Sequence, residues 1–363
     1  MKIINVTGAR PNMMKVAPLM EAMKKHRELK PVLIHTGQHY DEKMSKVFFD
    51  DLSMPEPDIY LGVGSGSHAE QTAKVMIEFE KILTSERPDM VVVVGDINST
   101  MACAITAVKL HIPVAHVEAG LRSFDRTMPE EINRIVTDSV SDYLFTTSED
   151  ANENLKREGI PDEKIYFAGN VMIDTLLRHR EKAQKSDIIK RLGLKERGYA
   201  VLTLHRPSNV DGKENFKRIL DAILQIQKRI KIVFPIHPRT LKMIKGHGLF
   251  DFAEELKNLA VVEPLGYLEF LKLMTDAKFV LTDSGGIQEE TTILNIPCLT
   301  LRENTERPVT VTEGTNIIVG NDRDTIIREA VNILNNGGKT GRIPKLWDGN
   351  AAERIVNVIL TNS

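Results

Sequence analysis

Cysteine is scarce in this sequence, with two residues among 363. Cys103 and Cys298 stand in apolar surroundings and form no metal-ligand spacing. Their number and spacing exclude a small domain held together by disulfides and a cysteine-based zinc site. We therefore expect two buried thiols in a protein of a reducing compartment.

The sequence also lacks an excess of charge of either sign. Its 48 basic and 50 acidic residues give a net charge of −2 at pH 7, so bulk charge favours neither nucleic acid nor a membrane surface as a partner. No run of 18 apolar residues occurs, and the first residues, MKIINVTGARP, lack the apolar stretch of a signal peptide. These absences predict a cytoplasmic protein with no nucleic-acid and no membrane partner.

Familiar cofactor motifs are incomplete. GVGSGS at 62–67 resembles a dinucleotide-binding loop, but Ser67 occupies the place of the third glycine. GGKT at 337–340 resembles the end of a P-loop, but Ile333 stands where the first glycine is required. No His-Glu-x-x-His sequence occurs. The sequence therefore indicates no nicotinamide cofactor and no bound metal.

What the chain does contain is a regular alternation of short β-branched runs and helical periodicity. Several runs, such as MVVVVGD (90–96), are apolar throughout, which is typical of strands buried on both faces of a parallel sheet. The segments 68–83 and 99–110 have the pattern of helices. The predicted strands are 2–8, 31–37, 90–96, 114–120, 143–148 and 164–169, followed by 199–205, 231–237, 259–264, 279–285, 297–301 and 315–320.

The length and the break in this pattern predict two domains. A chain of 363 residues exceeds one ordinary core, and after Arg180 the pattern thins into charged residues before it restarts. We expect two successive α/β domains, each with a parallel sheet. Because ligands of such sheets bind beyond the carboxyl ends of the strands, a cleft between the domains is the expected site.

Polar residues gather where the predicted strands end. Any one of them could be structural, for example Asp96 as a helix cap or Glu306 and Arg307 as a solvated pair. Their common position in both halves favours one shared site. The groups are Gly8–Lys15, Gly95–Thr100, His116–Arg122, Pro129–Glu131, His205–Pro207, His237–Arg239, Ser284–Gly286 and Glu306–Pro308.

The stretch LTDSGGIQEE (281–290) indicates the chemistry of a ligand. Backbone N–H groups at a helix N-terminus bind anions, and glycines let a phosphate approach them closely. Glu289 and Glu290, one turn later, could accept hydrogen bonds from sugar hydroxyls. The stretch is thus suited to a ligand that is part phosphate and part sugar, although a tight turn without a ligand would have the same sequence.

Taken together, these motifs resemble the non-hydrolysing UDP-N-acetylglucosamine 2-epimerases over nearly the whole chain and in the same order. Two departures are GARPN at 8–12, where the family usually has GTRPE, and Met128 in place of a tryptophan. The matching segments are HTGQHYD (35–41), VVGDINST (93–100), HVEAGLRS (116–123), PEEINR (129–134), TLHRPSN (203–209), LTDSGGIQEE (281–290) and TERP (305–308).

The resemblance implies the GT-B architecture, an α/β fold of two Rossmann-like domains facing a central cleft, in a homodimer. The domains implied are 1–172, on the sugar and catalytic side, and 173–349, on the UDP side. A C-terminal helix at about 350–363 would cross back to the first domain.

The resemblance also implies roles for individual residues. The diphosphate would be held by Arg10, Ser284, Gly285 and Gly286, with His237 as a further phosphate candidate. The nucleoside would be bound by Glu290 at the ribose, Phe270 and the Leu265 backbone at the uracil, and Arg307. The sugar would be surrounded by Lys15 and by the catalytic residues Asp96, Glu118, Glu130 and His205.

The reaction implied is reversible epimerisation of UDP-N-acetylglucosamine to UDP-N-acetylmannosamine, an isomerase step that would feed surface polysaccharide or glycan synthesis. The hydrogen on carbon 2 has no adjacent carbonyl, and no nicotinamide is indicated, so we expect elimination of UDP to 2-acetamidoglucal and re-addition. This needs a phosphate clamp and acid and base groups on both sugar faces. Asp96, Glu118 and Glu130 are all candidates for the base.

Other readings share most of these motifs. A hydrolysing 2-epimerase would release N-acetylmannosamine and UDP, a GT-B glycosyltransferase would need an acceptor, and a sugar-nucleotide sensor would show no turnover. Relatives also use a second substrate molecule as an allosteric activator, beside a pair resembling Gln38 and His39. Asp41 would weaken such a site, and the pair could instead cap the following helix.

Overall fold

The computed structural model describes residues 1–38, 51–52, 54–249 and 257–362. The chain divides into two compact units. Unit 1 comprises Met1–Arg178 and Lys345–Ser363, and unit 2 comprises His179–Pro344. The family resemblance had implied boundaries after residues 172 and 349. Helix α7 (Val171–Gln184) runs through the first boundary.

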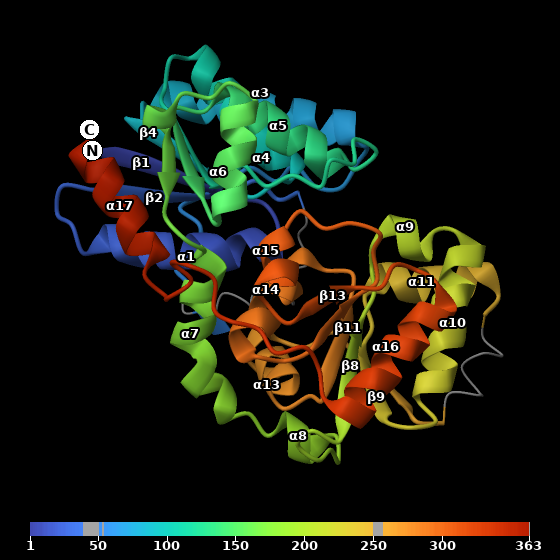
Figure 1. Cartoon of the computed structure of the whole chain (residues 1–363). Helices are drawn as coiled ribbons and strands as arrows, with labels where there is room; N and C mark the ends of the chain where they lie inside the picture. Colours follow the sequence, from blue (N-terminus) through green and yellow to red (C-terminus); the bar gives the residue numbers. More distant parts are fainter. Residues whose placement is uncertain (39–50, 53, 250–256, 363) are drawn as a thin grey trace. The chain divides into compact units, whose positions relative to one another are not determined.

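Unit 1 is built on a sheet whose described strands are all parallel, in the order β3-β2-β1-β4-β5-β6-β7. Its helices cover both faces, with α3, α4 and α5 on one and α1 on the other (Figure 1). The strands are β1 (Lys2–Thr7), β2 (Lys30–His35), β3 (Ile59–Tyr60), β4 (Met90–Val94), β5 (Val114–Ala119), β6 (Tyr143–Thr146) and β7 (Ile165–Phe167). The helices are α1 (Arg10–Lys24), α3 (His68–Glu86), α4 (Asn98–Lys109), α5 (Pro129–Val140), α6 (Glu149–Arg157), the short η1 (Asp162–Lys164) and α17 (Ala351–Thr361).

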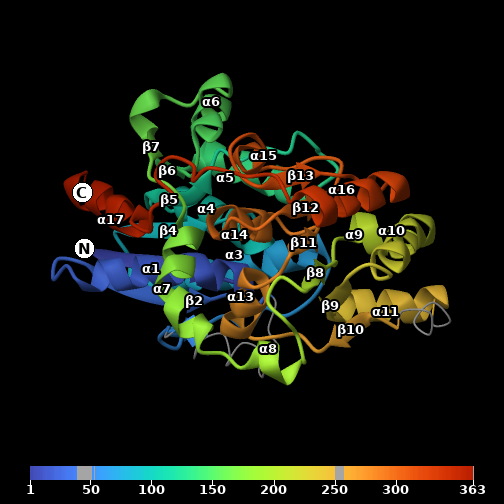
Figure 2. The same ribbon diagram turned by 60° about the horizontal axis from the view of Figure 1, so that its bottom comes forward.

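Unit 2 has a second parallel sheet, in the order β10-β9-β8-β11-β12-β13. Helices α10 and α16 lie side by side against it (Figure 2). The strands are β8 (Tyr199–Thr203), β9 (Lys231–Pro235), β10 (Leu259–Val262), β11 (Phe279–Thr282), β12 (Cys298–Thr300) and β13 (Asn316–Ile318). The helices are α8 (Ile188–Arg191), α9 (Pro207–Val210), α10 (Lys213–Ile226), α11 (Pro238–His247), α13 (Tyr267–Thr275), α14 (Gly285–Leu294), α15 (Pro308–Thr312) and α16 (Arg323–Asn336).

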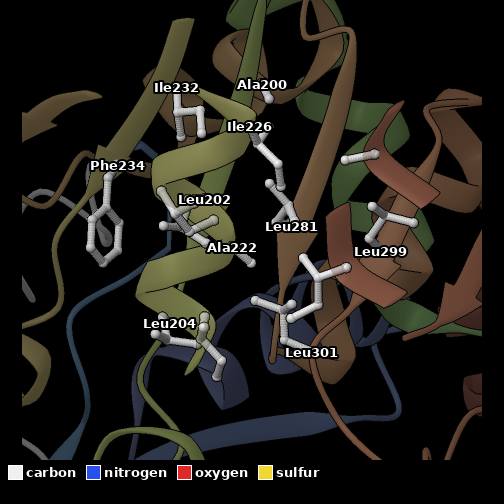
Figure 3. Packing of buried hydrophobic residues seen from close by; sticks show 14 of the residues in the cluster. Ala200, Leu202, Leu204, Ala222, Ile226, Ile232, Phe234, Leu281, Leu299 and Leu301 are labelled. Atoms are coloured by element: carbon white, nitrogen blue, oxygen red, sulfur yellow. The ribbon is translucent and has the colours of Figure 1, made fainter. Parts of the chain in front are cut away.

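The core of unit 2 shows why its strands read as apolar runs. Leu202 of β8, Leu204 just after β8 and Leu281 of β11 pack in one cluster with Ala222 and Ile226 of α10 (Figure 3). All five side chains are essentially excluded from solvent. At about 25 cal/mol per Å² of apolar surface, burial of this kind supplies most of the stabilisation of such a sheet.

The predicted fold class is confirmed: the chain is α/β, with two Rossmann-like parallel-sheet domains of the GT-B class. Every predicted strand is present, but the observed strands end up to three residues earlier, because the terminal residues belong to the polar turns. Strand β3, only two residues long, was not predicted since so short a run has no periodicity.

The return of the chain to unit 1 is fixed by polar contacts. The Trp347 indole N–H donates to the Thr147 carbonyl at 2.8 Å. Asp174 accepts from the backbone N–H groups of Ala351 and Ala352, at 3.1 and 2.7 Å, and so caps α17. Helix α17 packs on α1, and the two chain ends lie near each other (Figure 2). Among the described residues, no helix is long and apolar enough to cross a membrane.

Candidate active site

Both sheets have a point where the strand order reverses, and some of the predicted site residues follow the strands there. In unit 1 this point is between β1 and β4, and in unit 2 it is between β8 and β11. Open α/β sheets bind ligands outside the carboxyl ends of strands at such points. The two groups of residues are therefore described in turn, each within its own unit.

In unit 1, Lys15 and Glu118 form a buried ion pair, with side chains 8% and 3% exposed. Glu118 has φ +75°, and the register of β5 against β6 shifts at this residue. An irregularity of this kind turns a side chain away from its regular direction, and a left-handed non-glycine residue is costly, so both features are typical of functional sites. The strained backbone aims the Glu118 carboxylate at Lys15.

Asp96 belongs to a second group of ion pairs in unit 1, formed around a guanidinium. Arg134 of α5 pairs with Asp96 and with Glu131, and both carboxylates lie within 2.5 Å of its nitrogens. Glu131 also accepts from the Ser123 N–H at 3.0 Å. Burial alone would raise the pKa of the Glu131 carboxyl, but the Ser123 and Arg134 bonds lower it below its ordinary value. Asp96 is 26% exposed at the side chain and so remains accessible from one side.

Glu130 and Arg10 both stand at helix N-termini. Glu130 is half-buried in the first turn of α5, and within the described part of the chain it forms no ion pair. Arg10 is the first residue of α1 and lies two residues after Gly8. A Cβ added at Gly8 would lie 2.5 Å from the Thr36 hydroxyl. The tight packing at Gly8 brings the start of α1 close to the sheet.

Gln38 has a structural role in unit 1. Its side-chain oxygen accepts from the Ser99 N–H at 2.9 Å and from the Ser99 hydroxyl at 2.7 Å, which caps α4. Gln38 therefore caps a helix, as one alternative from the sequence had it, but this helix is α4 and not the one that follows residue 41. His39 and Asp41 lie outside the described residues.

In unit 2, Ser284, Gly285 and Gly286 form the N-terminus of α14, as the sequence predicted. The Arg307 guanidinium lies directly against this turn, because an added Cβ on Gly285 would be 2.4 Å from it. Arg307 pairs with Glu306 and, at 2.8 Å, with Glu289. Glu289 is therefore buried and turned toward Arg307.

Glu306 is surrounded by cations beneath the same turn. Arg302 lies 2.7 Å and Arg206 3.7 Å from its carboxylate, in addition to Arg307. Burial would raise the pKa of the Glu306 carboxyl, but these guanidinium groups hold it well below its ordinary value. Three guanidinium groups therefore lie around the start of α14, where the backbone N–H groups of a helix N-terminus favour an anion.

His205 is oriented by Asp283. Its Nδ1 lies 2.8 Å from the fully buried Asp283 carboxylate, which also accepts from the His205 and Arg206 backbone N–H groups. Burial would raise the pKa of the Asp283 carboxyl, but the imidazole and the N–H groups lower it to about 2. The ring of His237, which caps α11, lies 5.4 Å from that of His205. Nε2, on the far side of the His205 ring from Asp283, is the nitrogen placed for proton transfer.

Glu290 lies deeper in α14 and accepts from the Tyr267 hydroxyl at 3.1 Å. Burial, reinforced by neighbouring Glu289, raises the pKa of the Glu290 carboxyl to about 8, although the Tyr267 bond opposes this. Phe270 lies one turn along α13 from Tyr267 and is half-buried, as is Leu265 in the preceding loop. These predicted nucleoside residues therefore belong to one segment beside α14.

Sequence reasoning missed Arg134 and Asp283, which orient Asp96 and His205. Both stand in motifs that the sequence singled out, PEEINR and LTDSGG. The signal at Asp283 was a charged residue at the end of an apolar strand, where an unpaired charge would be costly. Arg134 gave no such signal, because the other buried residues of α5 are polar as well. Among the described residues, no group of three or more His, Cys, Asp or Glu is arranged to hold a metal ion.

Comparison with known proteins identifies the family. The family model described as UDP-N-acetylglucosamine 2-epimerase matches residues 21–360. The UDP-N-acetylglucosamine 2-epimerase of Methanocaldococcus jannaschii is 47% identical, over 99% of each chain. Its crystal structure with UDP-GlcNAc and UDP has a TM-score of 0.93 and covers 100% of both chains. The UDP-2,3-diacetamido-2,3-dideoxy-D-glucuronate 2-epimerase of Pseudomonas aeruginosa is 41% identical, over 94% of this chain and 93% of its own. The chain therefore belongs to the UDP-N-acetylglucosamine 2-epimerase family.

Proposed function

We propose that this chain interconverts UDP-N-acetylglucosamine and UDP-N-acetylmannosamine, without hydrolysis, by eliminating UDP and adding it back. The observation that carries this proposal is the division of chemistry between the two switch points. Unit 1 offers the carboxylates Asp96, Glu118 and Glu130 with Lys15. Unit 2 offers a helix N-terminus above buried arginines, together with an oriented histidine, His205.

In the elimination step, the bond from carbon 1 to the diphosphate breaks while a carboxylate removes the proton from carbon 2. The products are 2-acetamidoglucal and UDP. The Ser284–Gly286 turn and Arg10 stabilise the charge that develops on the leaving diphosphate. UDP then adds back to carbon 1, and a protonated group delivers a proton to the other face of carbon 2.

The remaining residues act on the nucleotide. Glu290 accepts from the ribose hydroxyls, Phe270 and the Leu265 backbone contact the uracil, His237 contacts phosphate, and Arg307 supports the turn from below. We further propose that the chain works as a homodimer and that its product supplies a polysaccharide or glycan pathway. Analytical ultracentrifugation at micromolar concentration tests the dimer.

The test of the reaction is proton NMR of UDP-N-acetylglucosamine with the pure protein in deuterated water. We expect deuterium at carbon 2 and an intact nucleotide sugar of both configurations. Free N-acetylmannosamine with UDP would instead identify a hydrolysing enzyme. No change without an acceptor would point to a glycosyltransferase, and binding without any turnover to a sensor.

A second candidate substrate is UDP-2,3-diacetamido-2,3-dideoxy-D-glucuronate, on which the 41% identical P. aeruginosa relative is named as acting. The same carbon 2 chemistry serves both sugars. The 47% identical relative favours UDP-N-acetylglucosamine. Measuring kcat/KM for both substrates decides between them, and a ratio above one for the diacetamido sugar would overturn the assignment.

A further inference from the structure

His116 is a buried histidine with an acceptor at each ring nitrogen. It lies in β5 and is 0% exposed. Its Nδ1 is 2.6 Å from the Asp138 carboxylate, and its Nε2 is 2.8 Å from the Gly95 carbonyl oxygen. A neutral imidazole has a single N–H, so only the doubly protonated ring donates to both partners. The geometry therefore places an imidazolium in the interior of unit 1.

The charges around this ring balance. Asp138 also pairs with Arg122 at 2.7 Å, and it accepts from the Gly120 N–H at 3.1 Å. Arg122 in turn pairs with Glu158 at 2.6 Å. Burial would raise the pKa of the Asp138 carboxyl, but the imidazole and Arg122 lower it below its ordinary value. Two cations and two carboxylates thus make a paired group, which is how a buried charge is tolerated.

The turn that His116 holds has its carbonyls fixed by side chains at three successive residues. The Val94 carbonyl accepts from Asn12 at 2.7 Å, the Gly95 carbonyl from His116, and the Asp96 carbonyl from Asn133 at 2.9 Å. Gly95 has φ +66°, and an added Cβ there would lie 3.0 Å from the Lys15 ammonium and 3.3 Å from the Glu118 carboxylate. The orientation of this turn therefore sets the distance between Asp96 and the Lys15–Glu118 pair.

We propose that His116 is a positioning residue, whose imidazolium holds the Gly95 carbonyl and thereby fixes Asp96 relative to Lys15 and Glu118. It touches no substrate. This inference rests on the proposed function for the roles of Asp96 and Glu118, but the doubly protonated ring does not depend on them.

The test compares two substitutions that each keep one of the two N–H donors of the imidazolium. The amide nitrogen of His116→Gln occupies the place of Nε2 and can still donate to Gly95, whereas that of His116→Asn occupies the place of Nδ1 and can donate only to Asp138. We expect kcat to fall about 100-fold in the asparagine variant, the scale of a misplaced reacting group, and about tenfold or less in the glutamine variant. KM should stay within about threefold of the wild-type value in both, because nucleotide binding does not involve this turn.

A purely structural role predicts the reverse order, because asparagine keeps the buried Asp138 satisfied. Equal activities, or a more active asparagine variant, would overturn the proposal. Nitrogen-15 NMR of the wild-type histidine rings at pH 7.5 is the second measurement. We expect one ring with both nitrogens protonated, which His116→Gln removes; a neutral His116 ring would overturn the proposal. Wild-type exchange at carbon 2, measured alongside, reports separately on the proposed function.

Discussion

Two adjacent carboxylates, Glu289 and Glu290, have opposite electrostatic surroundings although both are buried. Glu289 faces the Arg307 guanidinium at 2.8 Å, whereas Glu290 has the neutral Tyr267 hydroxyl. Burial therefore raises the pKa of the Glu290 carboxyl to about 8, so that it holds a proton at neutral pH. A ribose bound at Glu290 would meet either a donor or an acceptor, depending on pH.

The raised pKa of Glu290 has a consequence for stability. The unfolded chain binds this proton with a pKa near 4.5, and the folded chain with a pKa of about 8. Because the folded chain binds the Glu290 proton more tightly, this proton stabilises the fold fully below pH 4.5. The stabilisation decreases as the pH rises and is lost at about pH 8. We expect the free energy of unfolding, relative to that of Glu290→Gln, to fall between pH 5 and 8 by up to about 1.4 kcal/mol per pH unit.

Urea unfolding of both proteins across pH 5 to 9 measures this difference. The glutamine variant mimics the protonated carboxyl, and every other titrating group is shared, so the difference reports Glu290 alone. Glu263→Gln, at an exposed carboxylate, is the matched control and should show no such slope. Parallel curves for wild type and Glu290→Gln would mean that Glu290 is ionised in the folded protein.

The polar residues around the sugar should act on turnover rather than on binding. We expect Asp96→Asn, Glu118→Gln, Glu130→Gln and His205→Gln each to lower kcat by at least about 100-fold, the scale of lost acid–base catalysis. UDP affinity should change much less, because these side chains serve the sugar. Steady-state kinetics together with titration calorimetry measure both quantities. Near-full activity in all four variants would show that the reaction takes place elsewhere.

At the scale of elements, periodicity predicted the strands and the long helices, since their apolar faces repeat over many residues. It could not predict the irregularity at Glu118, which depends on the register of β5 against β6. Nor could it separate Glu289 from Glu290. One position along α14 decides whether a carboxylate faces Arg307 or Tyr267, and both partners come from distant parts of the chain.

Substitutions at Arg10 and at the N-terminus of α14 test binding and stability. Gly286→Val and Arg10→Ala should weaken UDP binding by about tenfold or more, the scale of a lost charge-assisted contact. Gly285→Ala should instead destabilise the fold by about 1–3 kcal/mol, because its Cβ would displace the doubly paired Arg307. Calorimetry and urea unfolding measure the two effects. Unchanged UDP affinity in both Gly286→Val and Arg10→Ala would remove this turn as the phosphate site.

At the scale of the whole molecule, the expected ligand contacts belong to both units, with Arg10 in unit 1 and Ser284–Gly286 in unit 2. A nucleotide that binds both favours whichever arrangement brings them together. We expect turnover to depend on this closure and to be stimulated by the substrate itself. Started from UDP-N-acetylmannosamine alone, the reaction should then show a lag that traces of the gluco epimer remove. An immediate hyperbolic rate would exclude such activation.

The capping of α17 by Asp174 has a consequence for synthesis on the ribosome. Unit 2 is one continuous stretch, His179–Pro344, whereas unit 1 needs residues from both sides of it. Ile355, Val356 and Ile359 of α17 are buried in unit 1 and emerge after all of unit 2. Domains generally fold as units during synthesis, so unit 2 can fold first. Until α17 has been synthesised, the apolar surface of α1 that α17 covers stays exposed. Unit 1, although it begins the sequence, therefore completes its fold after unit 2.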